Sequence, residues 1–195
     1  MSNRAMTEDR ELVAQILNGD MEAFKLLIKS NERLVAHMVG RLIPDHHDRE
    51  ELCQDVFLKV YQKLSSFNFA SKLSTWIATI AYRQSVNYLK KKRIPLKRTH
   101  IDDLEGDHKD YFVEHDTPES AFSSYHTREF LDQVIDQLPA HYKAVLTLYH
   151  LDEMSCSEIS EITDMPEGTV KNYLFRARKL LKNELSKYIR KEEIL

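Results

Sequence analysis

Residues 155–181 encode two short helical segments joined by a tight turn. Ser155 and Glu158 have the spacing of a capping box, in which each side chain binds the other residue's backbone N–H, so a helix is predicted to begin directly after Ser155. Asp164–Pro166 then predicts a turn, because proline suits the first turn of a helix, where its missing N–H removes no hydrogen bond. This pattern confines the C-terminal part of the chain to a pair of packed helices.

The second of these helices has one apolar face and one basic face. Its apolar residues Val170, Leu174, Ala177 and Leu181 recur at steps of four, three and four, which predicts burial of that face. The remaining faces carry Thr169, Lys171, Asn172, Phe175, Arg176, Arg178 and Lys179. Side chains of these types bind guanine and adenine edges, phosphates and the thymine methyl group. The segment therefore predicts a helix-turn-helix that reads the major groove, the alternative being an ordinary basic helix in solvent.

The whole chain is predicted to be all-α, because helical periodicity dominates and strand-like alternation is nearly absent. Its charge is segregated although the net charge is only −3. Arg83 to Arg98 holds seven Lys or Arg and no acid, whereas Thr99 to Phe130 holds nine Asp or Glu against two basic residues. This reversal predicts two small helical domains, residues 1–95 and 127–195, joined by an acidic flexible linker over residues 96–126.

Helix signals set the expected elements within these domains. Asp48–Glu51 has capping-box spacing with Asp in place of Ser, so a helix is expected to begin there, with Leu52, Val56 and Val60 on its buried stripe. The other helices are expected at about residues 7–18, 20–42, 74–93, 127–138 and 141–151, with Asp20 as the N-cap of the second.

The N-terminal domain is predicted to carry two different surfaces. One is acidic, with Glu50, Glu51, Gln54 and Asp55, and indicates either a basic protein partner or a solvated first turn that suits the helix dipole. The other is basic and aromatic, and its residues are Phe67, Asn68, Phe69, Lys72, Trp76, Arg83, Asn87, Lys90 and Lys91. Aromatic rings beside a basic stripe suit an unstacked base, while plain core packing of the rings is the alternative.

Several other classes of protein are not favoured. Cys53 and Cys156 lack metal-ligand spacing and are expected to be reduced thiols. His46 and His47 are expected in a solvated turn, and no phosphate loop, metal-protease motif or nucleophile elbow supports an enzyme, a cofactor or a metal site. No apolar run is long enough to insert into a membrane, so a cytoplasmic protein is expected.

Five motifs in order resemble a known family. They are Asp20–Phe24, Asp48–Tyr61, Ser74–Ala81, Asn87–Arg93 and Gly168–Arg178. Together they are similar to the extracytoplasmic-function (ECF) group of bacterial RNA polymerase sigma factors of the sigma-70 family. The resemblance covers residues 11–93 and 127–188.

This resemblance implies a non-enzymatic specificity subunit that directs promoter-specific transcription initiation in the bacterial cytoplasm. It places core polymerase docking on the β′ clamp helices at Glu51, Leu52, Gln54 and Asp55, with a further contact to the β flap. The residues from Phe67 to Lys91 named above would read and melt the −10 element, and the basic face of the helix-turn-helix would read the −35 element. The implied partners are core polymerase, promoter DNA and an anti-sigma factor.

Arg83 and Asn87 depart from the family pattern, which often has Asn and Asp there, so a promoter preference is not implied. A stand-alone helix-turn-helix regulator is the alternative function, although it leaves the acidic surface and the Trp76 segment without a role.

Overall fold

The computed structural model describes residues 3–92 and 124–192, and these are helical throughout apart from turns, with no strand among them. The helices are α1 (Asn3–Leu17), α2 (Met21–Leu42), α3 (His46–Lys63), a 3-10 turn η1 (Leu64–Ser66), α4 (Leu73–Lys91), α5 (Ser124–Gln137), α6 (Ala140–His150), α7 (Cys156–Thr163) and α8 (Glu167–Glu192). The all-α prediction is confirmed for this part of the chain. Most of the expected acidic linker lies outside the described residues.

Helix α2 begins where the sequence predicted. The Asp20 side chain accepts hydrogen bonds from the backbone N–H groups of Glu22 and Ala23, which satisfies two donors that have no partner within the helix. Gly19 turns the chain just before it with φ +93°, a left-handed conformation that favours glycine.

Helix α3 begins earlier than predicted, so the assignment of Asp48 as its cap was wrong. Asp45 is the N-cap, and its Oδ1 accepts a hydrogen bond from the Asp48 backbone N–H at 3.0 Å. Asp48 instead forms an ion pair with Lys92 at the end of α4, with Nζ and Oδ2 2.8 Å apart. This hydrogen bond raises the pKa of Lys92 and lowers that of Asp48. The pair joins the start of α3 to the end of α4.

Other helix ends also differ from the prediction. Helix α1 begins at Asn3 rather than Thr7, and α5 begins at Ser124 rather than Thr127. Helix α8 continues to Glu192, because nothing after Gly168 interrupts the helical pattern with glycine or proline.

The predicted helix-turn-helix is confirmed as α7 and α8. Both halves of the Ser155–Glu158 capping box are formed. Asp164 ends α7 in the left-handed conformation with φ 58°, which Asp tolerates better than most residues. Pro166 lies one residue before α8 and offers its carbonyl to the N–H of Val170 at 3.1 Å. The buried face of α8 carries Val170, Leu174 and Ala177, while Leu181 is half-buried.

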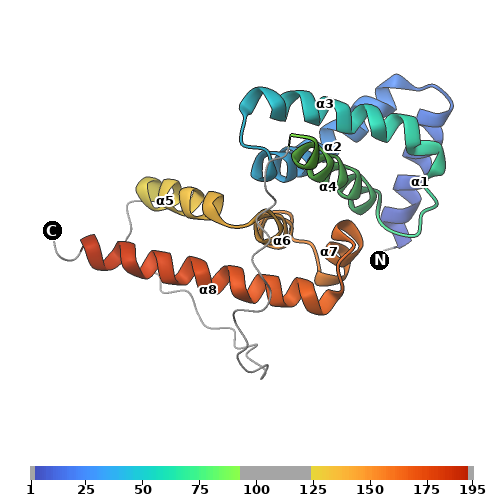
Figure 1. The fold of residues 1–195 in the computed structure, drawn as a ribbon. Coiled ribbons are helices and arrows are strands. Elements are labelled where there is room, and N and C mark those ends of the chain that lie inside the picture. The colour runs from blue at the N-terminus through green and yellow to red at the C-terminus, as the bar shows by residue number, and fades with distance from the viewer. Residues whose placement is uncertain (1–2, 93–123, 193–195) are drawn as a thin grey trace.

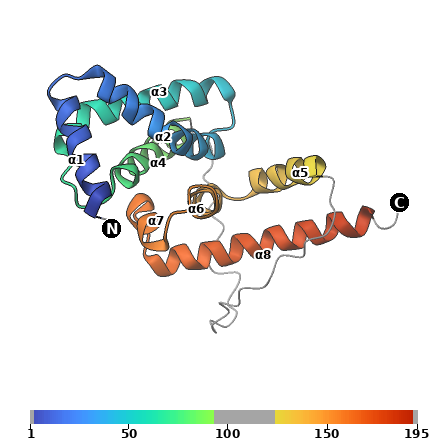
Figure 2. The same cartoon turned by 180° about the vertical axis from the view of Figure 1, so that it is seen from behind.

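The two groups of helices pack directly on one another. Helix α6 lies against α2 and α7 lies against α4, so α6 and α7 separate the N-terminal helices from the long α8 (Figure 1). The reverse view shows the same order, with the end of α8 extending away from the N-terminal helices (Figure 2). A single apolar cluster runs through both groups.

Neighbouring residues of α8 should differ in their effect on stability. Leu174 is 4% exposed and Phe175 is 58% exposed. We expect Leu174→Ala to lower the free energy of unfolding by about 2–5 kcal/mol because it leaves a cavity between α7 and α8. Phe175→Ala should change it by less than about 0.5 kcal/mol. Chemical denaturation followed by circular dichroism measures both, and equal losses would contradict this packing.

Candidate nucleic-acid interface

One face of α4 gathers most of the residues predicted to contact the −10 element. At 100° per residue, Trp76, Arg83, Asn87 and Lys90 fall on one narrow stripe, and Lys72 precedes it by one turn. Arg83, Asn87 and Lys90 are exposed, and Trp76 is half-buried. The opposite face is buried in the N-terminal core. The stripe therefore presents cations, an amide and an indole ring in a row that can follow a phosphate backbone.

An aromatic cluster lies at the start of this stripe. The rings of Phe67 and Phe69 are 4.6 Å apart between centroids, and those of Phe67 and Trp76 are 5.2 Å apart. Phe67 is only 6% exposed, so it supports the cluster from below instead of offering a free ring face. Phe69 and Trp76 are half-buried, and Arg10 of α1 stacks over the Phe69 ring at 4.6 Å. Core packing thus accounts for Phe67 but not for all three rings.

The loop that carries this cluster is held by local hydrogen bonds. Asn68 accepts a hydrogen bond from the Ala70 N–H at 3.1 Å through its side chain, and Phe69 adopts a left-handed conformation with φ 59°. Asp9 of α1 accepts a hydrogen bond from the Leu73 N–H at 3.3 Å, which supplies a cap that Lys72 cannot. These bonds set the direction in which Asn68 and Lys72 leave the loop.

The second candidate surface is the face of α8 opposite its apolar stripe. Lys171, Phe175 and Lys179 are exposed, and Thr169, Asn172 and Arg176 are half-buried beside them. Phe175 makes this face unusual, because a large ring that is 58% exposed has no packing role. Between Val170 and Lys182 the helix has no acidic residue, so the surface is suited to DNA.

Two of the predicted −35 residues have partners within the chain. Lys171 forms an ion pair with Glu167 at 2.8 Å, one turn earlier on α8. Arg178 contacts α6, with Nε 3.3 Å from His150 Nε2 and its guanidinium 5.1 Å from the centre of the Tyr149 ring. Burial lowers the pKa of His150, and the adjacent Arg178 lowers it further, which keeps the imidazole neutral enough to accept this hydrogen bond. Arg178 thus lies at the edge of the surface, bound to the helix behind it.

The predicted docking residues of α3 do not all lie on the surface. Glu51, Gln54 and Asp55 are exposed on one side of the helix. Leu52 is 6% exposed and belongs to the core with Val56, because its position faces inward on the helix. Its assignment as a docking contact stays a prediction. Leu52 fixes how α3 sits on the core and so how its exposed residues are presented.

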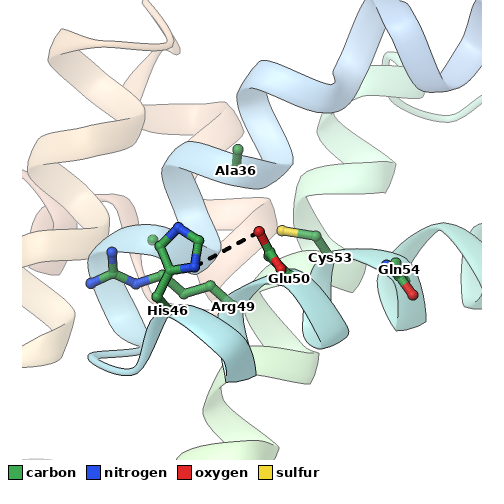
Figure 3. A pocket seen from close by; sticks show the side chains of 7 residues that line it. Ala36, His46, Arg49, Glu50, Cys53 and Gln54 are labelled. Atoms are coloured by element: carbon green, nitrogen blue, oxygen red, sulfur yellow. Dashed lines mark ion pairs between the residues drawn. The ribbon is translucent and has the colours of Figure 1, made fainter.

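A shallow groove of about 610 Å³ lies between α2 and α3 beside these residues (Figure 3). Ala36 and Gly40 of α2 line it, and the other lining residues are His46, Arg49, Glu50, Cys53 and Gln54. His46 and Glu50 approach within 3.7 Å across one turn of α3. Arg49 donates a hydrogen bond to the Ile43 carbonyl at 2.6 Å, which ties the start of α3 to the end of α2. The groove extends the exposed side of α3 onto α2.

Two apolar residues on the same side of α3 were missed by the sequence analysis. Leu58 is 56% exposed, and Tyr61 is 42% exposed with its ring 4.9 Å from that of Phe24. Their exposure could have been predicted from their positions in the sequence. They follow Gln54 by one and two helical turns and lie outside the buried stripe of Leu52, Val56 and Val60. The exposed side of α3 is therefore acidic at its start and apolar toward its end.

Within residues 3–92 and 124–192, no group of three or more His, Cys, Asp or Glu residues could hold a metal ion. None of the helices that the structure describes is both long and apolar enough to cross a membrane.

Comparison with known proteins identifies both halves of the chain. Residues 27–94 match the family model for sigma-70 region 2, and residues 128–181 match that for sigma-70 region 4. The chain is 32% identical over 186 residues to the ECF RNA polymerase sigma-E factor of Escherichia coli K12, covering 94% of this chain and 97% of that protein. It is 32% identical over 180 residues to the sigma-E factor of Haemophilus influenzae, covering 91% and 95%.

Two solved structures share the fold. One is CnrH in complex with the cytosolic domain of CnrY, with a TM-score of 0.65, 18% identity and coverage of 91% of this chain and 97% of that chain. The other is the sigma factor RpoE in complex with the anti-sigma factor NepR from Bartonella quintana, with a TM-score of 0.63, 20% identity and coverage of 84% and 96%. With regions 2 and 4 both matched and curated relatives aligned along nearly its whole length, the chain belongs to the ECF sigma factors of RNA polymerase.

Proposed function

We propose that this sigma factor divides promoter recognition between the two basic surfaces described above. The α4 stripe and its aromatic cluster bind the −10 element and hold an unstacked base, while the exposed face of α8 reads the −35 element. Opening the duplex needs no catalytic residue on this chain, because capture of a base offsets the few kcal/mol that unstacking costs.

The observation that carries this proposal is the alignment of Trp76, Arg83, Asn87 and Lys90 on one face of α4. A stand-alone helix-turn-helix regulator needs only the surface on α8, so a second stripe with a partly open aromatic cluster supports a two-element reader. Phe69 and Trp76 are the rings placed to stack on a base, with Phe67 as their support.

Core polymerase is proposed to dock on the exposed side of α3. Glu51, Gln54 and Asp55 supply an acidic and polar area, and Leu58 and Tyr61 continue it with apolar side chains. This composition suits a partner surface that carries both basic and apolar residues, which is the surface that we propose for the β′ clamp helices. Region 4 would make the further contact to the β flap.

An anti-sigma factor is proposed as the regulatory partner. The Bartonella quintana relative was solved in complex with one, and a partner that covers α3 or α4 would prevent docking or DNA binding. The site of action is the bacterial cytoplasm, where polymerase and promoter DNA are present, and no cofactor is required.

Run-off transcription with purified core polymerase on a genomic promoter library tests the function as a whole. We expect start sites that need this chain, because core polymerase alone does not select promoters. A stand-alone regulator would instead change transcription only when another sigma factor is present. Absence of any chain-dependent start site would refute the proposal.

Reversing charge on α3 should weaken docking. We expect the double variant Gln54→Lys and Asp55→Lys to lose at least about tenfold in affinity for core polymerase, since like charges then face the basic partner. The matched control is Glu11→Lys with Gln15→Lys, which adds the same charge to exposed positions on α1. Binding measured by fluorescence anisotropy should fall only for the α3 variant, and equal affinities would disprove this docking site.

Shortening a side chain on the α8 face should weaken promoter binding. Arg176→Ala is expected to cost about 1–3 kcal/mol of holoenzyme affinity and to relax choice at one base pair of the −35 element. Asn183→Ala, about two turns farther along α8, serves as the control. Footprinting over a set of −35 variants measures both effects, and an unchanged pattern for Arg176→Ala would contradict the assignment.

A further inference from the structure

The start of α1 lies beside the loop that joins η1 to α4, as both views of the fold show (Figure 1, Figure 2). Two adjacent residues of α1 contact this loop. Asp9 accepts a hydrogen bond from the Leu73 N–H at the start of α4, with Oδ2 3.3 Å from the nitrogen. The guanidinium carbon of Arg10 lies over the Phe69 ring, 4.6 Å from its centre. Helix α1 therefore helps to build the loop with the aromatic cluster, although it precedes the residues that match sigma-70 region 2.

The packing of α1 does not depend on Arg10. Val13 and Ile16 bury the inner face of the helix and are 2% and 3% exposed. Arg10 is exposed, and among the described residues its guanidinium contacts Phe69 rather than a carboxylate. A cation over a partly exposed ring adds little to the stability of a fold. Arg10 is therefore available for a ligand that reaches the same ring.

The guanidinium of Arg10 can donate hydrogen bonds while it contacts the ring. Five N–H groups surround it in its plane, and a single ring cannot occupy all of them. Because the group only donates, it binds best to an edge with two adjacent acceptors. Guanine presents O6 and N7, and an unpaired cytosine presents O2 and N3. Adenine has an amino group beside each acceptor on its Watson–Crick and Hoogsteen edges, and an N–H separates the two carbonyls of thymine.

The cluster beside Arg10 limits where an unstacked base can lie. Arg10 covers one face of Phe69, and the Phe67 ring lies 4.6 Å from the Phe69 ring between centroids. Phe69 has a left-handed backbone conformation with φ 59°, which is uncommon for a bulky residue, so contacts rather than local preference set the direction of its ring. A base that stacks on the open surface of Phe69 and Trp76 then lies within reach of the long Arg10 side chain.

We propose that Arg10 is a specificity-determining residue for the −10 element. Its N–H groups bind the edge of the base held at Phe69 and Trp76 and favour guanine or cytosine at that position. This inference rests on the proposed function, because it requires that the aromatic cluster captures a base. Asp9 acts differently: it caps α4 and positions the loop, and its carboxylate offers no donor to DNA.

The test uses the full-length chain assembled with core polymerase on one promoter that the run-off experiment identifies. Each −10 position is changed in turn to all four bases, and chain-dependent transcripts are counted by sequencing. For wild type we expect one position at which guanine or cytosine exceeds adenine and thymine by about fivefold to about a hundredfold, the range of a bidentate base contact. Arg10→Ala should remove this preference and leave the preferences at the other positions unchanged.

Three further variants separate base recognition from the other roles that Arg10 could have. Arg10→Lys keeps the charge but not the planar fork, so it should lose the same preference while it retains more transcription than Arg10→Ala. Asp9→Ala loosens the loop without removing a donor and should lower transcription for all four bases alike. Gln15→Glu makes the net charge more negative by one, as Arg10→Ala does, at an exposed position about 140° around α1, and should behave as wild type.

The outcomes are distinct. The inference is overturned if wild type has no position that favours guanine or cytosine, or if Arg10→Ala or Arg10→Lys keeps that preference. It is also overturned if Arg10→Ala lowers transcription equally for all four bases, because Arg10 would then contact phosphate or only support the loop, as Asp9 does. These results leave the proposed function standing. A wild-type chain that supports no transcription from any promoter would refute the proposed function and this inference with it.

Discussion

Helix α2 has to be buried on more than one side, and this constraint organises the molecule. It packs against α1, α3 and α4 within the N-terminal group and against α6 of the C-terminal group. Leu27, Val35 and Met38 are completely buried along it. Because α3 and α4 both pack on α2, its position determines that the acidic side of α3 and the basic stripe of α4 are exposed. His37 and Arg41 of α2 contact the second group of helices.

Much of the fold follows from local sequence signals. The capping box at Ser155 and the cap at Asp20 were predicted correctly because each needs only residues within one helical turn. The prediction of Asp48 as the N-cap of α3 was wrong because Asp45, three residues earlier, can also cap the helix. Asp45 follows Pro44 and has the extended conformation of an N-cap residue. The place of Leu52 on the apolar stripe correctly indicated its burial, while its role in docking rests on the resemblance alone.

The contact between the two groups could not be predicted from the sequence. Periodicity shows that Tyr82 or Ile162 lies on a buried face, but not which helix covers it. Ion pairs between residues 91 to 115 positions apart, such as Arg41 with Asp132 and His37 with Asp152, have no local pattern at all. The composition of the two DNA surfaces was readable from residue types. Their mutual position depends on long-range packing.

The carboxylate of Glu158 takes part in two separate contacts. It closes the capping box of α7 through Ser155 and pairs with Lys72 across the interface. Burial raises its pKa, but the bonds from Lys72 and Ser155 outweigh this and leave the pKa below its ordinary value. Glu158 therefore contributes to stability at pH values above its ordinary pKa, and this contribution is lost as the pH falls through its lowered pKa. A substitution at Glu158 therefore changes the start of the helix-turn-helix and the contact with Lys72 together, whereas a substitution at Arg41 or Asp132 changes a contact between the two groups of helices without altering a helix cap.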